Sequence, residues 1–76
     1  MAGTTMAIRA VCAVPLLDGI GATFVEDERG WRFLEWHMPG DMPLPHPPTK
    51  TDRERHFDTC EAAAKFFREQ YADWLR

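Results

Sequence analysis

The chain has 76 residues, of which 45% are hydrophobic and 12% aromatic, so it is too apolar for a disordered segment and large enough for one packed core. Nine basic residues against twelve acidic ones give a formal net charge of −3, which does not favour nucleic-acid binding through bulk electrostatics. The sequence contains no serine, and this excludes a serine hydrolase. We therefore expect residues 1–76 to form a single small domain.

The first predicted strand spans residues 6–14, where small and β-branched residues alternate. Pro15 is expected to end this strand because proline cannot donate a hydrogen bond to the ladder. The dipeptide Asp18-Gly19 predicts a turn within residues 16–21.

A hairpin is predicted next. Residues 22–26 and 31–38 form its two strands, and residues 27–30 form a tight connection in which Gly30 suits a positive φ. The acidic run at this connection is typical of a solvated turn.

The third strand carries large apolar side chains on both of its faces. Strict alternation places Trp31 and Phe33 on one face, and Leu34, Trp36 and Met38 on the other. One helix can cover only one face of an open antiparallel sheet. We expect the helix to cover Leu34, Trp36 and Met38, which leaves Trp31 and Phe33 on the outer face.

Residues 39–50 contain five prolines and predict an extended loop that crosses the sheet. Residues 51–57 alternate acidic and basic side chains, which favours a short, solvated edge strand. A helical turn is the alternative for this segment.

The C-terminal segment predicts one helix over about residues 59–75. Asp58 as N-cap and Glu61 at the third helical position form a capping box. An apolar stripe at helical spacing follows, formed by Cys60, Ala63, Ala64, Phe67, Tyr71, Trp74 and Leu75. The predicted fold is α+β: an antiparallel sheet of three to four strands packed on one C-terminal helix.

Patterns for catalysis or metal binding are weak. No candidate ligands have the spacing of a zinc site, so no metal or cofactor is expected; the candidates are Cys12, His37, His46, His56 and Cys60. Cys60 lies in the first helical turn, where a thiol pKa falls, but it also begins the apolar stripe. We expect a buried thiol there and a protein without enzymatic activity.

The two cysteines also bear on location. Small secreted domains carry more cysteines than this as disulfide staples, so Cys12 and Cys60 are expected to be reduced thiols in a cytoplasmic protein. The excess of arginine over lysine is typical of a GC-rich bacterial or phage genome, so the expected location is the cytoplasm of a bacterial host. The apolar run 10–20 is too short to span a membrane, and no membrane partner is expected.

Two segments carry a resemblance to known modules. Trp31-Arg32-Phe33 after a glycine, with Phe57-Asp58-Thr59 before an alanine-rich helix, resembles the sheet-plus-helix modules of phage integrase arm-binding domains and plant ethylene-response-type DNA-binding domains. The helix start is also similar to that of HicB-type antitoxins. These resemblances imply two alternatives: an antitoxin-like partner of a small toxin, or a nucleic-acid-binding sheet that uses Arg29, Arg32, Arg53 and Arg55.

Size, acidic charge and a surplus of aromatic residues resemble the anti-CRISPR proteins of phages as a class. This resemblance implies a non-enzymatic inhibitor that occupies a nucleic-acid-binding or assembly surface of a host defence complex. The protein partner would be a subunit of a CRISPR surveillance complex, with nucleic acid not expected as a partner. Aromatic anchors would supply affinity and acidic groups would speed encounter; the candidates are Trp31, Phe33, Trp36, Phe66, Asp27, Glu28, Asp52 and Glu54.

Overall fold

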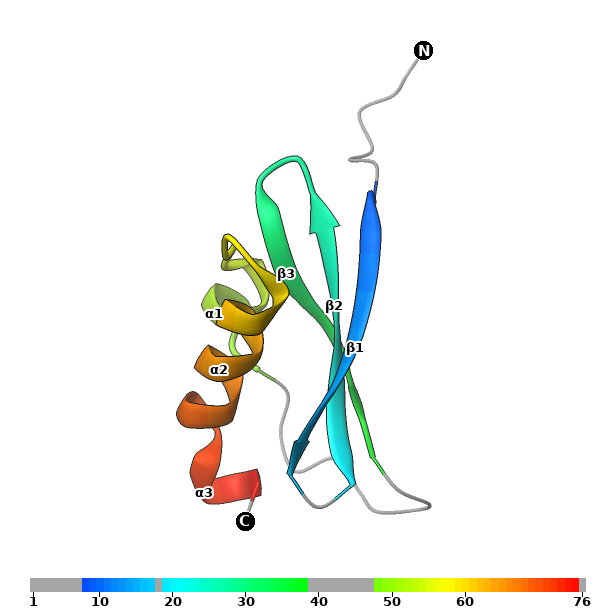
Figure 1. The fold of residues 1–76 in the computed structure, drawn as a ribbon. Helices are drawn as coiled ribbons and strands as arrows, with labels where there is room; N and C mark the ends of the chain where they lie inside the picture. The colour runs from blue at the N-terminus through cyan, green and yellow to red at the C-terminus, as the bar shows by residue number, and fades with distance from the viewer. Residues whose placement is uncertain (1–7, 18, 39–47, 76) are drawn as a thin grey trace.

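A computed structural model describes residues 8–17, 19–38 and 48–75 (Figure 1). Three strands form an antiparallel sheet in the order β1-β2-β3, with β1 at Ala10–Leu17, β2 at Ile20–Asp27 and β3 at Gly30–His37. The helices lie along one face of this sheet (Figure 1); they are α1 (Lys50–Glu54), α2 (Cys60–Gln70) and α3 (Ala72–Leu75). The predicted α+β class is confirmed. Most of the predicted proline-rich loop, at 39–47, lies outside the described residues.

β1 continues past the proline that was expected to end it. Pro15 pairs with Gly21 of β2, and the register shifts between Pro15 and Leu17. Proline is tolerated there because β1 is an edge strand, where a missing N–H need not break a ladder bond. The predicted turn over 16–21 is therefore shorter in the structure, and Gly19 adopts a φ of 82°.

A bulge in β3 decides which side chains face the helices. The register shifts between the pairs Thr23–Glu35 and Phe24–Phe33, so that Leu34 is an extra residue on β3. Strict alternation fails at this point. Leu34, predicted to pack on the helix, is 47% exposed.

Trp31 and Phe33 consequently lie on the helix side, and their predicted place on the outer face is wrong. Phe33 is 5% exposed, and its ring stacks on that of Phe67 with 5.0 Å between centroids. Trp36, correctly predicted to face the helix, contacts Phe67 edge-on at 6.1 Å. Trp31 is half-buried and packs against the same core.

Phe67 of α2 is the centre of the core and is completely buried. Rings from the sheet and from the helices surround it at centroid distances of 5.0 to 6.4 Å. The predicted apolar stripe of α2 is confirmed for Cys60, Ala63, Ala64, Phe67 and Tyr71, which are all buried. The side chains of Trp74 and Leu75 lie outside the described part of the chain.

The segment predicted as a short edge strand over 51–57 instead begins with the helix α1. Thr49 is its N-cap, and its Oγ1 accepts a hydrogen bond from the backbone N of Asp52 at 3.1 Å. The alternation of charges suggested a strand, but the capping bond and the burial of Asp52 stabilise a helical turn. Only Phe57 pairs with the sheet, through two 2.8 Å backbone hydrogen bonds to Trp31.

Gly30 makes this bridge possible. Its φ is 127°, a conformation that side-chain-bearing residues rarely adopt. A Cβ at Gly30 would lie 2.5 Å from the carbonyl oxygen of Phe57. The tip of the β2–β3 hairpin and the segment before α2 therefore meet backbone to backbone.

The N-cap of α2 lies one residue beyond the predicted position. Thr59 Oγ1 accepts a hydrogen bond from the backbone N of Ala62 at 3.0 Å, and the helix begins at Cys60. With Thr59 as cap, Glu61 is the second helical residue, so the predicted capping box does not form. The helix is interrupted at Tyr71, and the single predicted helix is resolved into α2 and α3.

We predict that Thr59→Ala lowers stability by about 1 kcal/mol, since that is the typical loss when an N-cap hydroxyl is removed. For a domain of this size the melting temperature should fall by about 4–8 °C. Asp58→Ala is the matched control and should change it little. A larger loss in Asp58→Ala than in Thr59→Ala, measured by thermal melts, would place the cap at Asp58.

A second pair of variants tests the bulge in β3. Phe33→Ala should cost about 3–5 kcal/mol because it removes a buried ring, which is enough to unfold or nearly unfold a small domain. Leu34→Ala should cost less than about 1 kcal/mol because the side chain is half exposed. Urea unfolding of both variants measures the difference, and equal losses would contradict the observed register.

Candidate protein-binding surface

β1 is an outer strand of the sheet. In the part of the chain that the structure describes, β1 pairs with β2 alone. Its eight residues, AVCAVPLL, include no charged side chain. Natural edge strands usually carry charges, prolines or bulges that prevent pairing with other chains. Here Pro15 and the register shift protect only the C-terminal end of β1, so Ala10–Val14 remain a regular, uncharged edge.

The outer face of β1 is also apolar. Cys12 and Val14 pack against the core, so alternation directs Val11 and Ala13 to the face away from the helices. Val11 is 64% exposed, and Ala13 is exposed as well. Edge and outer face together offer backbone hydrogen-bonding groups beside small apolar side chains, and we call Ala10–Val14 with its outward side chains the β1 surface.

The four aromatic anchor candidates belong to the core or its margin. Phe33 is buried beneath α2 and is not available for surface contact, while Trp31, Trp36 and Phe66 are half-buried. Phe66 packs beside Phe57 at 5.2 Å between centroids. The guanidinium of Arg55 covers the Phe66 ring at 4.6 Å, so Phe66 closes the edge of the core.

The four acidic candidates divide into two kinds. Glu28 at the hairpin turn and Glu54 in α1 are exposed, whereas Asp27 and Asp52 are buried. A partner cannot reach the two buried carboxylates without rearrangement of the fold. Both act instead inside the domain, as hydrogen-bond acceptors for segments distant in sequence.

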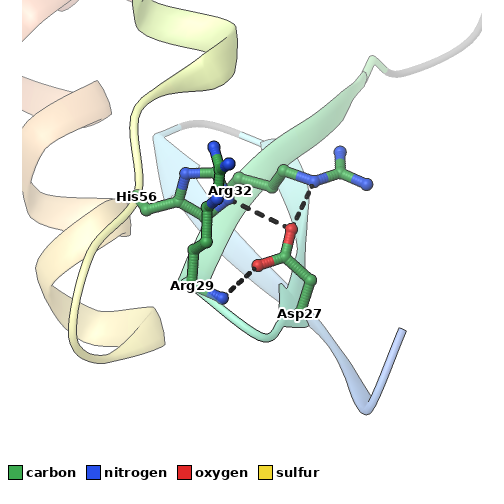
Figure 2. A network of polar contacts seen from close by, with 4 residues as sticks. All are labelled: Asp27, Arg29, Arg32 and His56. Carbon is green, nitrogen blue, oxygen red and sulfur yellow. Dashed lines mark hydrogen bonds and ion pairs between the residues drawn. The ribbon is translucent and has the colours of Figure 1, made fainter. Parts of the chain in front are cut away.

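Asp27 is the acceptor of a network at the end of β2 (Figure 2). Its side chain is 0% exposed. Its Oδ2 accepts from Arg32 Nε at 3.1 Å and lies 3.1 Å from His56 Nε2, and its Oδ1 accepts from the backbone N of Arg29 at 2.8 Å. Figure 2 shows His56 reaching this carboxylate from the segment that follows α1. The network therefore joins the hairpin tip to the connection between α1 and α2.

Burial alone would raise the pKa of Asp27, because desolvation disfavours the charged form. The hydrogen bonds from His56, Arg29 and Arg32 stabilise the carboxylate and outweigh that effect, so that the pKa falls from 3.8 to about 2. Folding therefore favours the ionised form of the Asp27 carboxylate.

Asp52, a residue of α1, is the second buried hydrogen-bond acceptor. Its Oδ2 accepts a hydrogen bond from Tyr71 Oη at 2.8 Å, and Tyr71 Oη accepts one from the backbone N of Thr49 at 3.3 Å. Burial, together with the hydrogen bond to Asp52, raises the pKa of Tyr71 to about 12. These contacts tie α1 to the C-terminal end of α2.

Two pockets lined by described residues flank the helices. One, of about 320 Å³, lies between β3 and α1; Arg32, Lys50 and Arg53 line it beside Glu54, Phe33 and Leu34. The other, of about 330 Å³, lies between β1 and α2, and its walls include Cys12, Cys60 and Arg68. Of the four arginines considered for nucleic-acid contact, Arg32 is engaged by Asp27 and Arg55 by aromatic rings.

Comparison of the chain with known protein families, with characterised proteins and with solved structures finds no match. No helix in the described ranges is long and apolar enough to cross a membrane. Within the same ranges, no group of three or more His, Cys, Asp or Glu side chains is placed to hold a metal ion.

The Asp27 network generates a pH prediction. The pKa of Asp27 in the folded state lies below its unfolded value of 3.8. The stabilisation of the fold by the ionised carboxylate is therefore complete above about pH 4 and is lost as the pH falls towards 2. The difference corresponds to roughly 2 kcal/mol. Asp27→Asn should lower stability at pH 7 and weaken the decline between pH 4 and 2. Denaturant unfolding across this range tests it, and parallel curves for the two proteins would contradict it.

Proposed function

We propose that this chain is a non-enzymatic binding protein that inhibits its partner by occupying the partner's surface, and that the β1 surface makes the contact. The observation that carries the proposal is the uncharged, regular edge at Ala10–Val14, with Val11 64% exposed. An exposed sheet edge binds an extended segment of a partner by adding a strand. Main-chain hydrogen bonds then supply affinity, and the side chains beside them supply specificity.

The core of the domain packs against the inner face of β1 and holds the strand in place. Cys12 and Val14 anchor β1 to the core, and α2 packs across the inner face of the sheet. An edge held in its extended conformation before binding loses less conformational entropy when a partner strand pairs with it. The rigid sheet thus favours binding at β1 over binding by a segment that must first become ordered.

The specific form of the proposal is an inhibitor encoded by a phage or mobile element, of the anti-CRISPR type. Its partner would be a subunit of a CRISPR surveillance complex in the bacterial cytoplasm. The net charge of −3 supports this form, because nucleic-acid-binding surfaces are basic and complementary charge speeds encounter. Glu28 and Glu54 are the exposed acids among the candidates and would face such a surface.

A nucleic-acid-binding role is the second candidate. The pocket lined by Arg32, Lys50 and Arg53 favours it, since clustered cations contact phosphates. Glu54 in the same wall and the acidic balance of the chain weaken the attraction. We expect binding to duplex DNA no tighter than about 10⁻⁴ M at physiological salt, the range of non-specific complexes.

A plasmid-interference assay with a panel of CRISPR systems tests the first candidate. Expression of the wild-type chain should restore transformation in at least one system. Val11→Lys should weaken binding to the isolated complex at least 10-fold, because it places a charge on the contact strand. Thr51→Lys is the matched control: it adds the same charge at an exposed position of α1 and should bind as wild type.

Failure to inhibit any system would reject the anti-CRISPR form. Equal affinity of Val11→Lys and Thr51→Lys would reject the β1 surface as the point of contact. Sub-micromolar, salt-sensitive binding to duplex DNA that Arg53→Glu abolishes would favour the nucleic-acid role instead.

A further inference from the structure

The fold brings together two cysteines that are far apart in the sequence. Cys12 pairs with Phe24 across the β1–β2 ladder and lies on the inner face of β1. Cys60 is the first residue of α2 and is 8% exposed. Both thiols are free, and the two side chains belong to the same core cluster and line the same pocket. The pair does not form a Cys-x-x-Cys motif, because β1 supplies one thiol and α2 supplies the other.

A pocket gives small molecules access to the pair. It has a volume of about 330 Å³, and both cysteines line it. Cys12 is half-buried and Cys60 is buried, so Cys12 is the thiol that an incoming reagent reaches first. Arg68 lies in the pocket wall and supplies a guanidinium, which binds carboxylates well.

We propose that Cys12 and Cys60 form a reactive dithiol site, which a small disulfide such as oxidised glutathione converts into an intramolecular disulfide joining β1 to α2. In the first step the Cys12 thiolate attacks one sulfur of the glutathione disulfide. A bond forms between Cys12 Sγ and that sulfur, the original S–S bond breaks, and one glutathione leaves as its thiolate. In the second step the Cys60 thiolate attacks Cys12 Sγ and displaces the other glutathione. The two protein thiols are oxidised, the glutathione disulfide is reduced to two thiols, and the two protons lost by the protein are taken up by these thiols.

The second step is the slow one. Burial raises the pKa of Cys60 to about 12, and the neighbouring Cys12 thiol and Glu61 act in the same direction. Arg68 is the cation that lies in the same pocket wall. Because only the thiolate attacks, the rate of ring closure should rise about 10-fold per pH unit between pH 7 and 9.

A disulfide between Cys12 and Cys60 would join β1 to α2 and close a loop that contains most of the described chain. A cross-link between residues so distant in sequence restricts the unfolded chain. We expect the melting temperature of the oxidised protein to rise by about 10 °C. The edge strand would then be held to the helix covalently as well as by packing.

The test incubates the full chain with oxidised glutathione at pH 8 and follows intact mass and free thiols. Wild-type protein should end as a monomer that has lost two hydrogen atoms and both thiols, and dithiothreitol should reverse the change. Cys60→Ala should stop with one bound glutathione, and Cys12→Ser should react at least 10-fold more slowly than Cys60→Ala. The proposal is overturned if wild type stays reduced, stops at the mixed disulfide or forms disulfide-linked dimers. It is also overturned if Cys12→Ser reacts as fast as Cys60→Ala, which would show that Cys12 is not the entry thiol.

Discussion

The contact on which the domain depends is that between the Phe67 ring and the sheet. Phe67 is completely buried, and aromatic rings from β2, β3, α2 and the segment before α2 pack around it. A domain of this size buries a smaller share of its surface than a larger domain does, so one fully buried aromatic cluster supplies much of its stabilisation. β2, β3 and the segment before α2 each present at least one ring to this site. Even the bulge in β3 serves it, because the extra residue lets Phe33 and Trp36 both reach Phe67.

The polar contacts act at the margins of this cluster. Asp27 holds His56 at one end of the sheet, and Asp52 holds Tyr71 at the other end of the helix layer. Each carboxylate is buried and has hydrogen-bond donors, which offsets the cost of removing its charge from water. Together they fix the short helix α1 against β3, although α1 has too few residues to be stable alone.

Local patterns predicted the elements that depend on local physics. The hairpin around Gly30 and the apolar stripe from Cys60 to Tyr71 both follow from spacing within one element, and both are present. The bulge at Leu34 depends on pairing between strands, and alternation within β3 contains no sign of it. The cap at Thr49 was visible, since a threonine three residues before an acid is a known helix start, but the alternating charges after it favoured a strand.

The candidate site shows the same division. Glu28 and Glu54 are exposed, as expected for a solvated turn and a solvated charged segment, although Glu54 lies in α1 and not on the predicted edge strand. Asp27 and Asp52 were predicted as surface groups, since acidic residues are seldom buried unless they are paired. Their partners His56 and Tyr71 lie far along the chain, and no spacing rule connects them. The meeting of Cys12 with Cys60 was missed for the same reason.

The close approach of Gly30 to Phe57 limits how this sequence can diverge. Any residue with a side chain at position 30 would push its Cβ against a backbone carbonyl, and backbone atoms cannot move aside as a flexible side chain can. Relatives that keep the bridge between β3 and the start of α2 must therefore keep glycine there, whatever else they replace. A glycine followed by an aromatic residue, with a second aromatic residue just before a threonine-capped helix, is thus a pattern by which distant relatives can be recognised once overall identity has been lost.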